Sequence, residues 1–268
     1  MPMAAKFEDS THQLWSCETT AGSMVLKVCN HQSVEKSTFW LGMNTLFDMQ
    51  FPSSLGSIDA IHQLLTEHGS FKVPPYIASQ ASSYVLTGFL VGQDVKESNI
   101  TDDLVKRLAE HLACLHQQSH TQWGSIQQPK LTAEQWPHRL QQALLTLLDE
   151  QSIDIPADII KQVMSQLALI QVDSFVPIMA DLRWDQLRIL DTGDMAVVDL
   201  DAFVIGPREL ELLLLEYLLT AQQAAIFKTA YQQYLAWPDL SNQRLSYRLL
   251  LFLMNVLGET DLDAWLNH

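Results

Sequence analysis

Cysteine is scarce in this chain: of its 268 residues only Cys17, Cys29 and Cys114 carry a thiol. The three are odd in number and widely spaced, and no two of them form a Cys-x-x-Cys pair. This pattern argues against a disulfide framework and against a structural zinc site. It is typical of a reducing compartment, so we expect a cytoplasmic protein.

Long hydrophobic runs are also missing. The longest, over residues 210–219, is interrupted by Glu211 and Glu216 and is too short to span a bilayer. The first seven residues contain no apolar core of signal-peptide length. The sequence therefore predicts no membrane segment. Its length is sufficient for one large domain or for two coupled lobes.

Positive charge is in short supply, with 16 basic against 31 acidic side chains and a formal net charge of −15 at pH 7. Phosphates would be repelled at long range, which argues against nucleic acid or an anionic membrane as a partner. From Lys96 onward there are 12 basic and 23 acidic side chains, so most of the excess lies in the second part. That excess favours a cationic substrate there, or it serves only solubility.

The first ninety residues carry mainly strand patterns. Residues 13–17 and 23–29 flank a turn of small residues, which predicts a β-hairpin. Apolar residues at helical spacing predict one helix over 57–68. A further strand is expected at 83–86. Residues 30–56 show no regular pattern, and their conformation cannot be inferred.

The remainder is mostly helical. Helices are expected over 101–116, 132–150 and 156–170 and from Glu209 onward. Residues 176–200 interrupt this pattern with two apolar strands joined by an Asp-Thr-Gly-Asp turn.

These patterns predict an α+β fold with two lobes. Residues 1–91 would form a small N-terminal lobe with an antiparallel sheet and one helix. Residues 92–268 would form a larger, mainly helical lobe that contains a single β-hairpin. A turn at residues 92–94 is expected at the boundary.

Carboxylates bracket that hairpin. The run Asp181-Leu182-Arg183-Trp184-Asp185-Gln186 precedes its first strand, and Asp199 ends its second. A kinase catalytic loop has Asp-Leu-x-x-x-Asn, followed after a short hairpin by a metal-binding aspartate. One carboxylate then faces the acceptor hydroxyl while the other holds magnesium on the phosphates. A hairpin places both at the same edge.

One lysine, Lys27, interrupts an otherwise apolar strand over residues 24–28. Burying an ammonium group is costly unless an anion accompanies it, and in a kinase the ATP phosphates are that anion. A strand lysine can also extend its amine to solvent. In combination with Asp181 and Asp199, the nucleotide role is favoured.

In this order the motifs resemble those of the aminoglycoside phosphotransferase and choline kinase superfamily, which has a protein-kinase-like fold. The resemblance spans nearly the whole chain. Residues 11–15 and 25–27 resemble its first strands, 108–116 its helix ending in Leu-His, 178–186 its catalytic loop, 198–201 its metal-binding strand and 206–211 the following helix start.

The resemblance implies ATP or GTP and Mg²⁺ as cofactors, and a role for each matching position. Lys27 would hold the phosphates, with Asp59 as its acidic partner. Asp181 would orient or deprotonate the acceptor hydroxyl. Thr11 would lie beside the phosphates, Gly88 and Leu90 would meet the base, Gln186 and Asp199 would bind magnesium, and Asp201, Glu209 and Glu211 are candidates for contacting the substrate.

Three features depart from the family pattern. Met179 replaces a histidine that braces the catalytic loop, and Gln186 replaces a metal-binding asparagine. Glu8 and Asp9 lie in the stretch expected over the phosphates, where each carboxylate would cost about 1 to 4 kcal/mol at contact distance. Together, these departures favour an alternative function: a catalytically impaired pseudokinase that binds a nucleotide or metabolite, or an interaction module.

The acceptor is open to several chemistries. Antibiotic, sugar, choline-like and thiamine-like hydroxyls are all compatible with the pattern, and the fold cannot choose among them. The histidines His12 and His62 lack metal-ligand spacing and are interpreted as surface or structural residues, and His116 as a packed helix-end residue.

Overall fold

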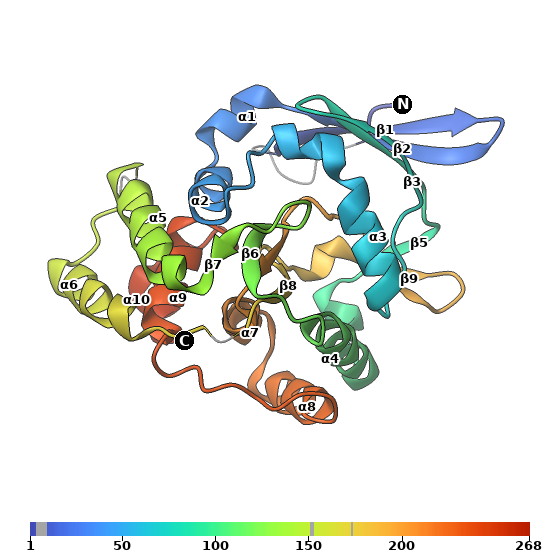
Figure 1. Cartoon of the computed structure of the whole chain (residues 1–268). Helices are drawn as coiled ribbons and strands as arrows, with labels where there is room; N and C mark the ends of the chain where they lie inside the picture. The colour runs from blue at the N-terminus through green and yellow to red at the C-terminus, as the bar shows by residue number, and fades with distance from the viewer. Residues whose placement is uncertain (4–9, 151–152, 173) are drawn as a thin grey trace.

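A computed structural model of the chain describes residues 1–3, 10–150, 153–172 and 174–268. They form an α+β fold with two lobes, a smaller one built on a sheet and a larger one built mainly of helices (Figure 1). Glu8 and Asp9, one of the departures noted above, lie outside the described residues.

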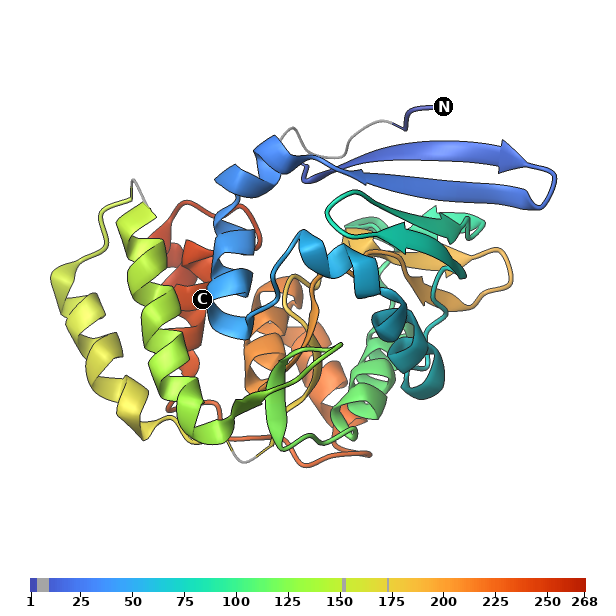
Figure 2. The same cartoon turned by 45° about the horizontal axis from the view of Figure 1, so that its top comes forward.

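The smaller lobe is an antiparallel four-stranded sheet in the order β1-β2-β4-β3. Its strands are β1 (His12–Thr19), β2 (Gly22–Cys29), β3 (Tyr76–Gln80) and β4 (Tyr84–Gly88). The predicted hairpin is confirmed: β1 and β2 pair throughout and project from the lobe (Figure 2). The turn between them requires Gly22, whose φ of 117° is unfavourable for any residue with a side chain.

Residues 30–56, for which no regular pattern was seen, contain two helices, α1 (His31–Lys36) and α2 (Thr38–Phe47). The Ser37 side chain caps α2 by accepting a hydrogen bond from the Trp40 backbone N–H. The helix packs against α5 (Trp136–Glu150) of the larger lobe, although it precedes the boundary expected after residue 91. Because α2 is buried on several sides, its sequence lacks the single apolar stripe by which a helix is usually detected.

One helix of the smaller lobe was predicted, and it is α3 (Asp59–His68). The larger lobe contains α4 (Asp102–His116), α5, α6 (Ala157–Gln166), α7 (Arg208–Leu218), α8 (Ala221–Tyr231), α9 (Arg244–Leu253) and α10 (Leu262–Leu266). Thr101 caps α4 as expected, through the Leu104 backbone N–H. Among the described residues, no helix is long and apolar enough to cross a bilayer.

Two small sheets run through the larger lobe. One has the order β10-β9-β5, with β9 (Leu187–Leu190) and β10 (Met195–Val197) forming the predicted hairpin and β5 (Gly92–Asp94) pairing with β9. Residues 92–94, expected to be a turn, are therefore a strand that pairs the connector between the lobes with the β9–β10 hairpin. The other sheet has the order β7-β6-β11-β8, with β6 (Gln122–Ser125), β7 (Leu131–Thr132), β8 (Val176–Met179) and β11 (Phe203–Gly206).

Aromatic side chains join α2, α5 and α9 to this second sheet. Trp123 lies edge-on to Phe47 and to Trp136, and Trp136 also contacts Phe175 and Tyr247. All five are fully or almost fully buried. Such contacts fix the strand β8, which leads directly into Asp181, against the helical core.

Candidate active site

Lys27 lies on β2, a central strand of the sheet, opposite Leu14 of β1 and Val85 of β4. Its Nζ is 2.6 Å from Asp199 Oδ1 and 3.1 Å from Asp201 Oδ2. These residues are more than 170 positions apart in the sequence. The structure therefore brings the predicted lysine and the predicted metal-binding aspartate into one ionic cluster between the lobes.

The two aspartates of this cluster are not equivalent. The Asp199 side chain is 41% exposed, whereas that of Asp201 is 5% exposed and that of Lys27 13%. Asp201 also lies 3.4 Å from Nε2 of the buried His12, which packs edge-on to Phe51. Asp201 was predicted as a candidate for contacting the substrate. The structure does not support this role, because its carboxylate faces Lys27 and is not open to a substrate.

Asp59 does not contact Lys27. It is exposed at the start of α3, and the ion pairs of Lys27 are those with Asp199 and Asp201. The prediction of a Lys27–Asp59 pair is wrong, since the buried face of α3 carries His62 instead. His12 and His62, interpreted as surface or structural residues, are both buried beside this cluster, and their spacing gave no signal of it.

Asp181 follows β8 and begins the catalytic loop. Its Oδ2 accepts a hydrogen bond from Gln186 Nε2 at 2.9 Å, and its Oδ1 is buried with no hydrogen-bond partner among the described residues. An unpaired buried carboxylate oxygen is costly, so it marks a place where a ligand hydroxyl could donate. This is the geometry expected of a residue that receives the proton of an acceptor.

Gln186 does not present its oxygen to a metal. The amide oxygen accepts a hydrogen bond from the Arg183 backbone N–H at 2.9 Å, and the residue is only 2% exposed. The opposite amide orientation would place a donor against that N–H and an acceptor against the Asp181 carboxylate. The predicted metal-ligand role is therefore corrected: Gln186 holds Asp181 and closes the loop.

Burial and the nearby charge of Asp199 raise the pKa of Asp181 to about 7. Burial would likewise raise the pKa of Asp199, but Lys27 outweighs it and holds that pKa at about 2. Burial would lower the pKa of Lys27, yet Asp199 and Asp201 keep it above its usual value. The site thus contains one carboxyl with a pKa near neutrality, Asp181, and one that is fully ionised, Asp199. Such a division is typical of acid–base sites.

A second polar cluster lies behind the loop. Glu211 on α7 accepts hydrogen bonds from the Met179 backbone N–H at 2.8 Å and is 2.7 Å from His116 Nε2 at the end of α4. His116 Nδ1 contacts the Tyr231 hydroxyl at 2.9 Å, and Arg208 donates to that hydroxyl. The Glu211 and His116 side chains are both 0% exposed.

This rear cluster supplies the brace that Met179 cannot provide as a side chain, because Glu211 holds the backbone two residues before Asp181. The prediction that Glu211 contacts a substrate is wrong, since the side chain is sealed from solvent. His116 is confirmed as a packed helix-end histidine. Glu209, the other candidate on α7, is half-buried with its Oε1 3.7 Å from Arg208 Nε.

The predicted base-binding and phosphate-side residues are placed as follows. Thr11 Oγ1 accepts a hydrogen bond from Trp40 Nε1 at 3.4 Å, so the hydroxyl is held by the smaller lobe. Gly88 N–H donates to Pro75 and Phe89 N–H to Ser23. The Leu90 backbone N–H makes no hydrogen bond to another described residue.

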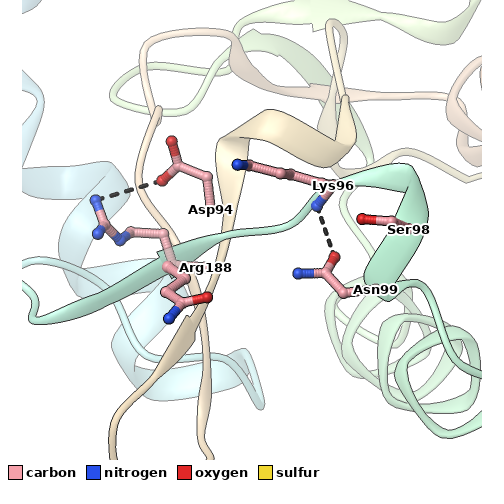
Figure 3. A pocket seen from close by; sticks show the side chains of 6 residues that line it. Asp94, Lys96, Ser98, Asn99 and Arg188 are labelled. Carbon is pink, nitrogen blue, oxygen red and sulfur yellow. Dashed lines mark hydrogen bonds and ion pairs between the residues drawn. The ribbon is translucent and has the colours of Figure 1, made fainter.

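Beside the connector is a polar pocket of about 510 Å³, lined by Gln93, Asp94, Lys96, Ser98, Asn99 and Arg188 (Figure 3). Arg188, two residues after Gln186, lies 3.4 Å from Asp94 and over the Phe89 ring of the connector. Two cations and one carboxylate line this pocket, so it does not form an anionic cage for an ammonium group.

Magnesium binds hard oxygen ligands and commonly takes one or two carboxylates together with substrate phosphates. Asp199, which is ionised and 41% exposed, fits this use, and Gln186 as oriented does not. No group of three or more acidic, histidine or cysteine side chains suited to a metal occurs in the described part of the chain. A divalent ion here would therefore depend on the phosphates for most of its ligands.

This chain belongs to the phosphotransferase enzyme family, whose model matches residues 7–244. A search of curated proteins finds no match. The family membership agrees with the resemblance seen in the sequence and makes the protein a member of a kinase-like enzyme class.

Solved structures show the same fold at low sequence identity. A putative fructosamine-3-kinase from Thermobifida fusca is 16% identical, with a TM-score of 0.68 over 100% of this chain and 90% of that one. Choline kinase from Streptococcus pneumoniae is 15% identical, with a TM-score of 0.61 over 99% and 88%. Spectinomycin phosphotransferase, solved with ADP and spectinomycin, is 12% identical, with a TM-score of 0.57 over 98% and 84%.

Proposed function

We propose that this protein transfers the γ-phosphoryl group of ATP or GTP, in the presence of Mg²⁺, to a hydroxyl group of a small molecule. The observation that carries the proposal is the convergence of residues from distant parts of the sequence: Lys27 contacts Asp199, whose charge in turn acts on Asp181. The ADP complex of the similar spectinomycin phosphotransferase supports a nucleotide as the donor.

Asp181 acts on the acceptor. Its unpaired Oδ1 receives the hydroxyl proton as the acceptor oxygen bonds to the γ-phosphorus. The bond from that phosphorus to the bridging oxygen breaks, and the nucleoside diphosphate leaves with the electron pair. A pKa of about 7 suits a base that must both take up and release this proton near neutral pH.

Lys27 and Asp199 act on the donor. Lys27 holds the phosphates by charge-assisted hydrogen bonds, and Asp199 would hold the magnesium ion. The bound ion supplies neutralisation of phosphate charge. Because phosphoryl transfer depends mainly on positioning and charge, these residues and the loop brace can account for most of the catalytic effect.

The acceptor class follows only from composition. The acidic excess after Val95 favours a cationic metabolite or antibiotic, whereas the pocket beside the connector offers Lys96 and Arg188. Three half-buried free cysteines fit the proposed reducing, cytoplasmic environment. We place the division of the lobes at the connector, between residues 91 and 92.

A pseudokinase is the second candidate. Two observations favour it: Lys27 pairs directly with Asp199, where nucleotide phosphates would have to enter, and the Gln186 oxygen is engaged within the loop. Such a protein would bind a nucleotide or metabolite, or serve as an interaction module, without transferring phosphate to any acceptor.

Thermal unfolding with ATP and with GTP, each with and without magnesium, tests the proposal. Nucleotide at about 100 times its dissociation constant adds roughly 2.7 kcal/mol to the free energy of unfolding. For a chain of this size that is a rise of about 5–10 °C in the midpoint. The magnesium-dependent part should disappear in Asp199→Ala. The absence of any shift at millimolar nucleotide would contradict a working phosphate site.

A further inference from the structure

Lys27 has two carboxylate partners where one would neutralise it. A lysine ammonium has three donor hydrogens, and here one is directed to Asp199 and one to Asp201. The third remains for a ligand. The partners differ about eightfold in exposure, 41% for Asp199 and 5% for Asp201.

Asp201 is held from several sides. It lies two residues before the start of β11, its Oδ2 contacts both Lys27 Nζ and His12 Nε2, and its Oδ1 is buried without a partner among the described residues. A buried carboxylate that lost its cation would be left uncompensated at a cost of several kcal/mol. Asp201 therefore cannot readily give up Lys27.

Asp199 has no such restraint. It lies beyond the end of β10, in a segment without strand pairing, and much of its side chain is open to solvent. Water or a ligand can replace Lys27 at this carboxylate, because 41% of the Asp199 side chain is open to solvent and Lys27 still keeps Asp201.

No acid on α3 competes for Lys27. The helix places His62 on its buried face and Asp59 in solvent. The carboxylates that restrain the lysine therefore come from the larger lobe.

We propose that Asp201 is the permanent partner that positions Lys27, while Asp199 is an exchangeable partner that leaves the lysine when a magnesium–nucleotide complex binds. The second half of this inference rests on the proposed function, but the first half concerns the nucleotide-free protein. Asp201 is thus a positioning residue for the phosphate-binding lysine.

The first half is tested without nucleotide by a double-mutant cycle on unfolding, using Lys27→Met and Asp201→Asn. We expect a coupling of at least tenfold in the folding equilibrium, about 1.4 kcal/mol. The control cycle, Lys27→Met with Asp59→Asn, should show none. Equal coupling in the two cycles would overturn the assignment.

Asp201→Asn alone leaves Lys27 with one carboxylate and could fail to fold. In that case the double variant Lys27→Met/Asp201→Asn, which removes both charges, should fold better than the single variant. A double variant no more stable than Asp201→Asn would count against the pairing.

The second half is tested by thermal shift with ADP, with and without magnesium, and by the rate of ATP hydrolysis. Asp201→Asn should keep the magnesium-dependent shift but lose at least tenfold in the hydrolysis rate, and Asp199→Asn should lose the shift. If Asp201→Asn also loses the magnesium-dependent shift, Asp201 is a metal ligand and the inference is wrong. If the wild type shows no shift, the proposed function fails, and the coupling cycle still decides the role of Asp201.

Discussion

The catalytic loop separates two polar clusters of similar chemistry and different accessibility. In front lie Lys27, Asp199 and Asp201, with one carboxylate 41% exposed. Behind lie Glu211 and His116, sealed at 0% exposure, with Tyr231 and Arg208 completing a hydrogen-bonded chain. Both clusters pair acids with basic groups, but only the front one contains a group that can exchange its partner.

The difference shows how burial assigns a role to an acidic residue. Asp199 can bind a ligand because its carboxylate, once separated from Lys27, is hydrated by water. Glu211 cannot, because each of its oxygens already accepts a hydrogen bond and no water can replace either donor. Residue type alone therefore does not separate a candidate ligand from a structural brace.

The largest effect is expected for Asp181→Asn, which lies between the clusters. The asparagine keeps the hydrogen bond from Gln186 but cannot accept the acceptor proton, so turnover should fall about 10²–10⁴-fold. Nucleotide affinity, measured by calorimetry, should stay nearly unchanged. Full activity in this variant would remove Asp181 from the mechanism.

Glu211→Gln tests the rear cluster. The amide oxygen can still accept from the Met179 N–H if the amide NH2 group faces His116, but the hydrogen bonds to a buried carboxylate are lost, at a cost of about 2–3 kcal/mol. The unfolding midpoint should fall by about 5–10 °C. The control is Glu67→Gln on α3, whose side chain is 55% exposed and whose charge should matter by less than about 1 kcal/mol. Similar decreases of the unfolding midpoint in both variants would show that the Glu211 brace does not stabilise the fold more than an exposed charge does.

The pH dependence of stability tests the raised pKa of Asp181, which lies between the two clusters. The pKa of Asp181 is about 7 in the folded protein and about 3.9 in an unfolded chain. The folded state therefore holds a proton that the unfolded state has released between those values. This contribution to stability is fully present below about pH 4 and is lost as the pH rises through 7.

Asp181→Asn does not titrate, so its stability relative to the wild type should increase between pH 5 and pH 8. We expect a gain of about 1 kcal/mol or more, or about 2–4 °C in the unfolding midpoint. Parallel midpoint-against-pH curves for the two proteins would contradict the raised pKa.

The smallest effect is expected for Asp199→Asn in the absence of nucleotide. Lys27 keeps Asp201, and because the Asp199 side chain is 41% exposed, solvent screening limits the loss to about 1 kcal/mol. Chemical denaturation should therefore barely separate this variant from the wild type. A loss as large as that of Glu211→Gln would show that the front cluster is as rigid as the rear one.

The fold could be read from sequence wherever local signals were strong. The β1–β2 hairpin, α3, α4 and the β9–β10 hairpin follow from alternation, helical spacing, the Thr101 cap and turn residues. The helices α1 and α2 were both missed. For α2 the reason is that α5 and the core cover it, so that it has apolar residues on several faces. The short strand β5 was missed because its pairing with β9 is a tertiary contact.

The sequence by itself determined the α+β class and the order of motifs from which Lys27, Asp181 and Asp199 are proposed as a phosphotransferase site. Only the tertiary structure decided which acids are ligands and which are supports. In the structure, Asp201 and not Asp59 contacts Lys27, Glu211 is a buried brace, and the Gln186 amide oxygen accepts a hydrogen bond within the loop. These choices depend on distance and burial between residues up to 174 positions apart, which no local pattern of side chains records.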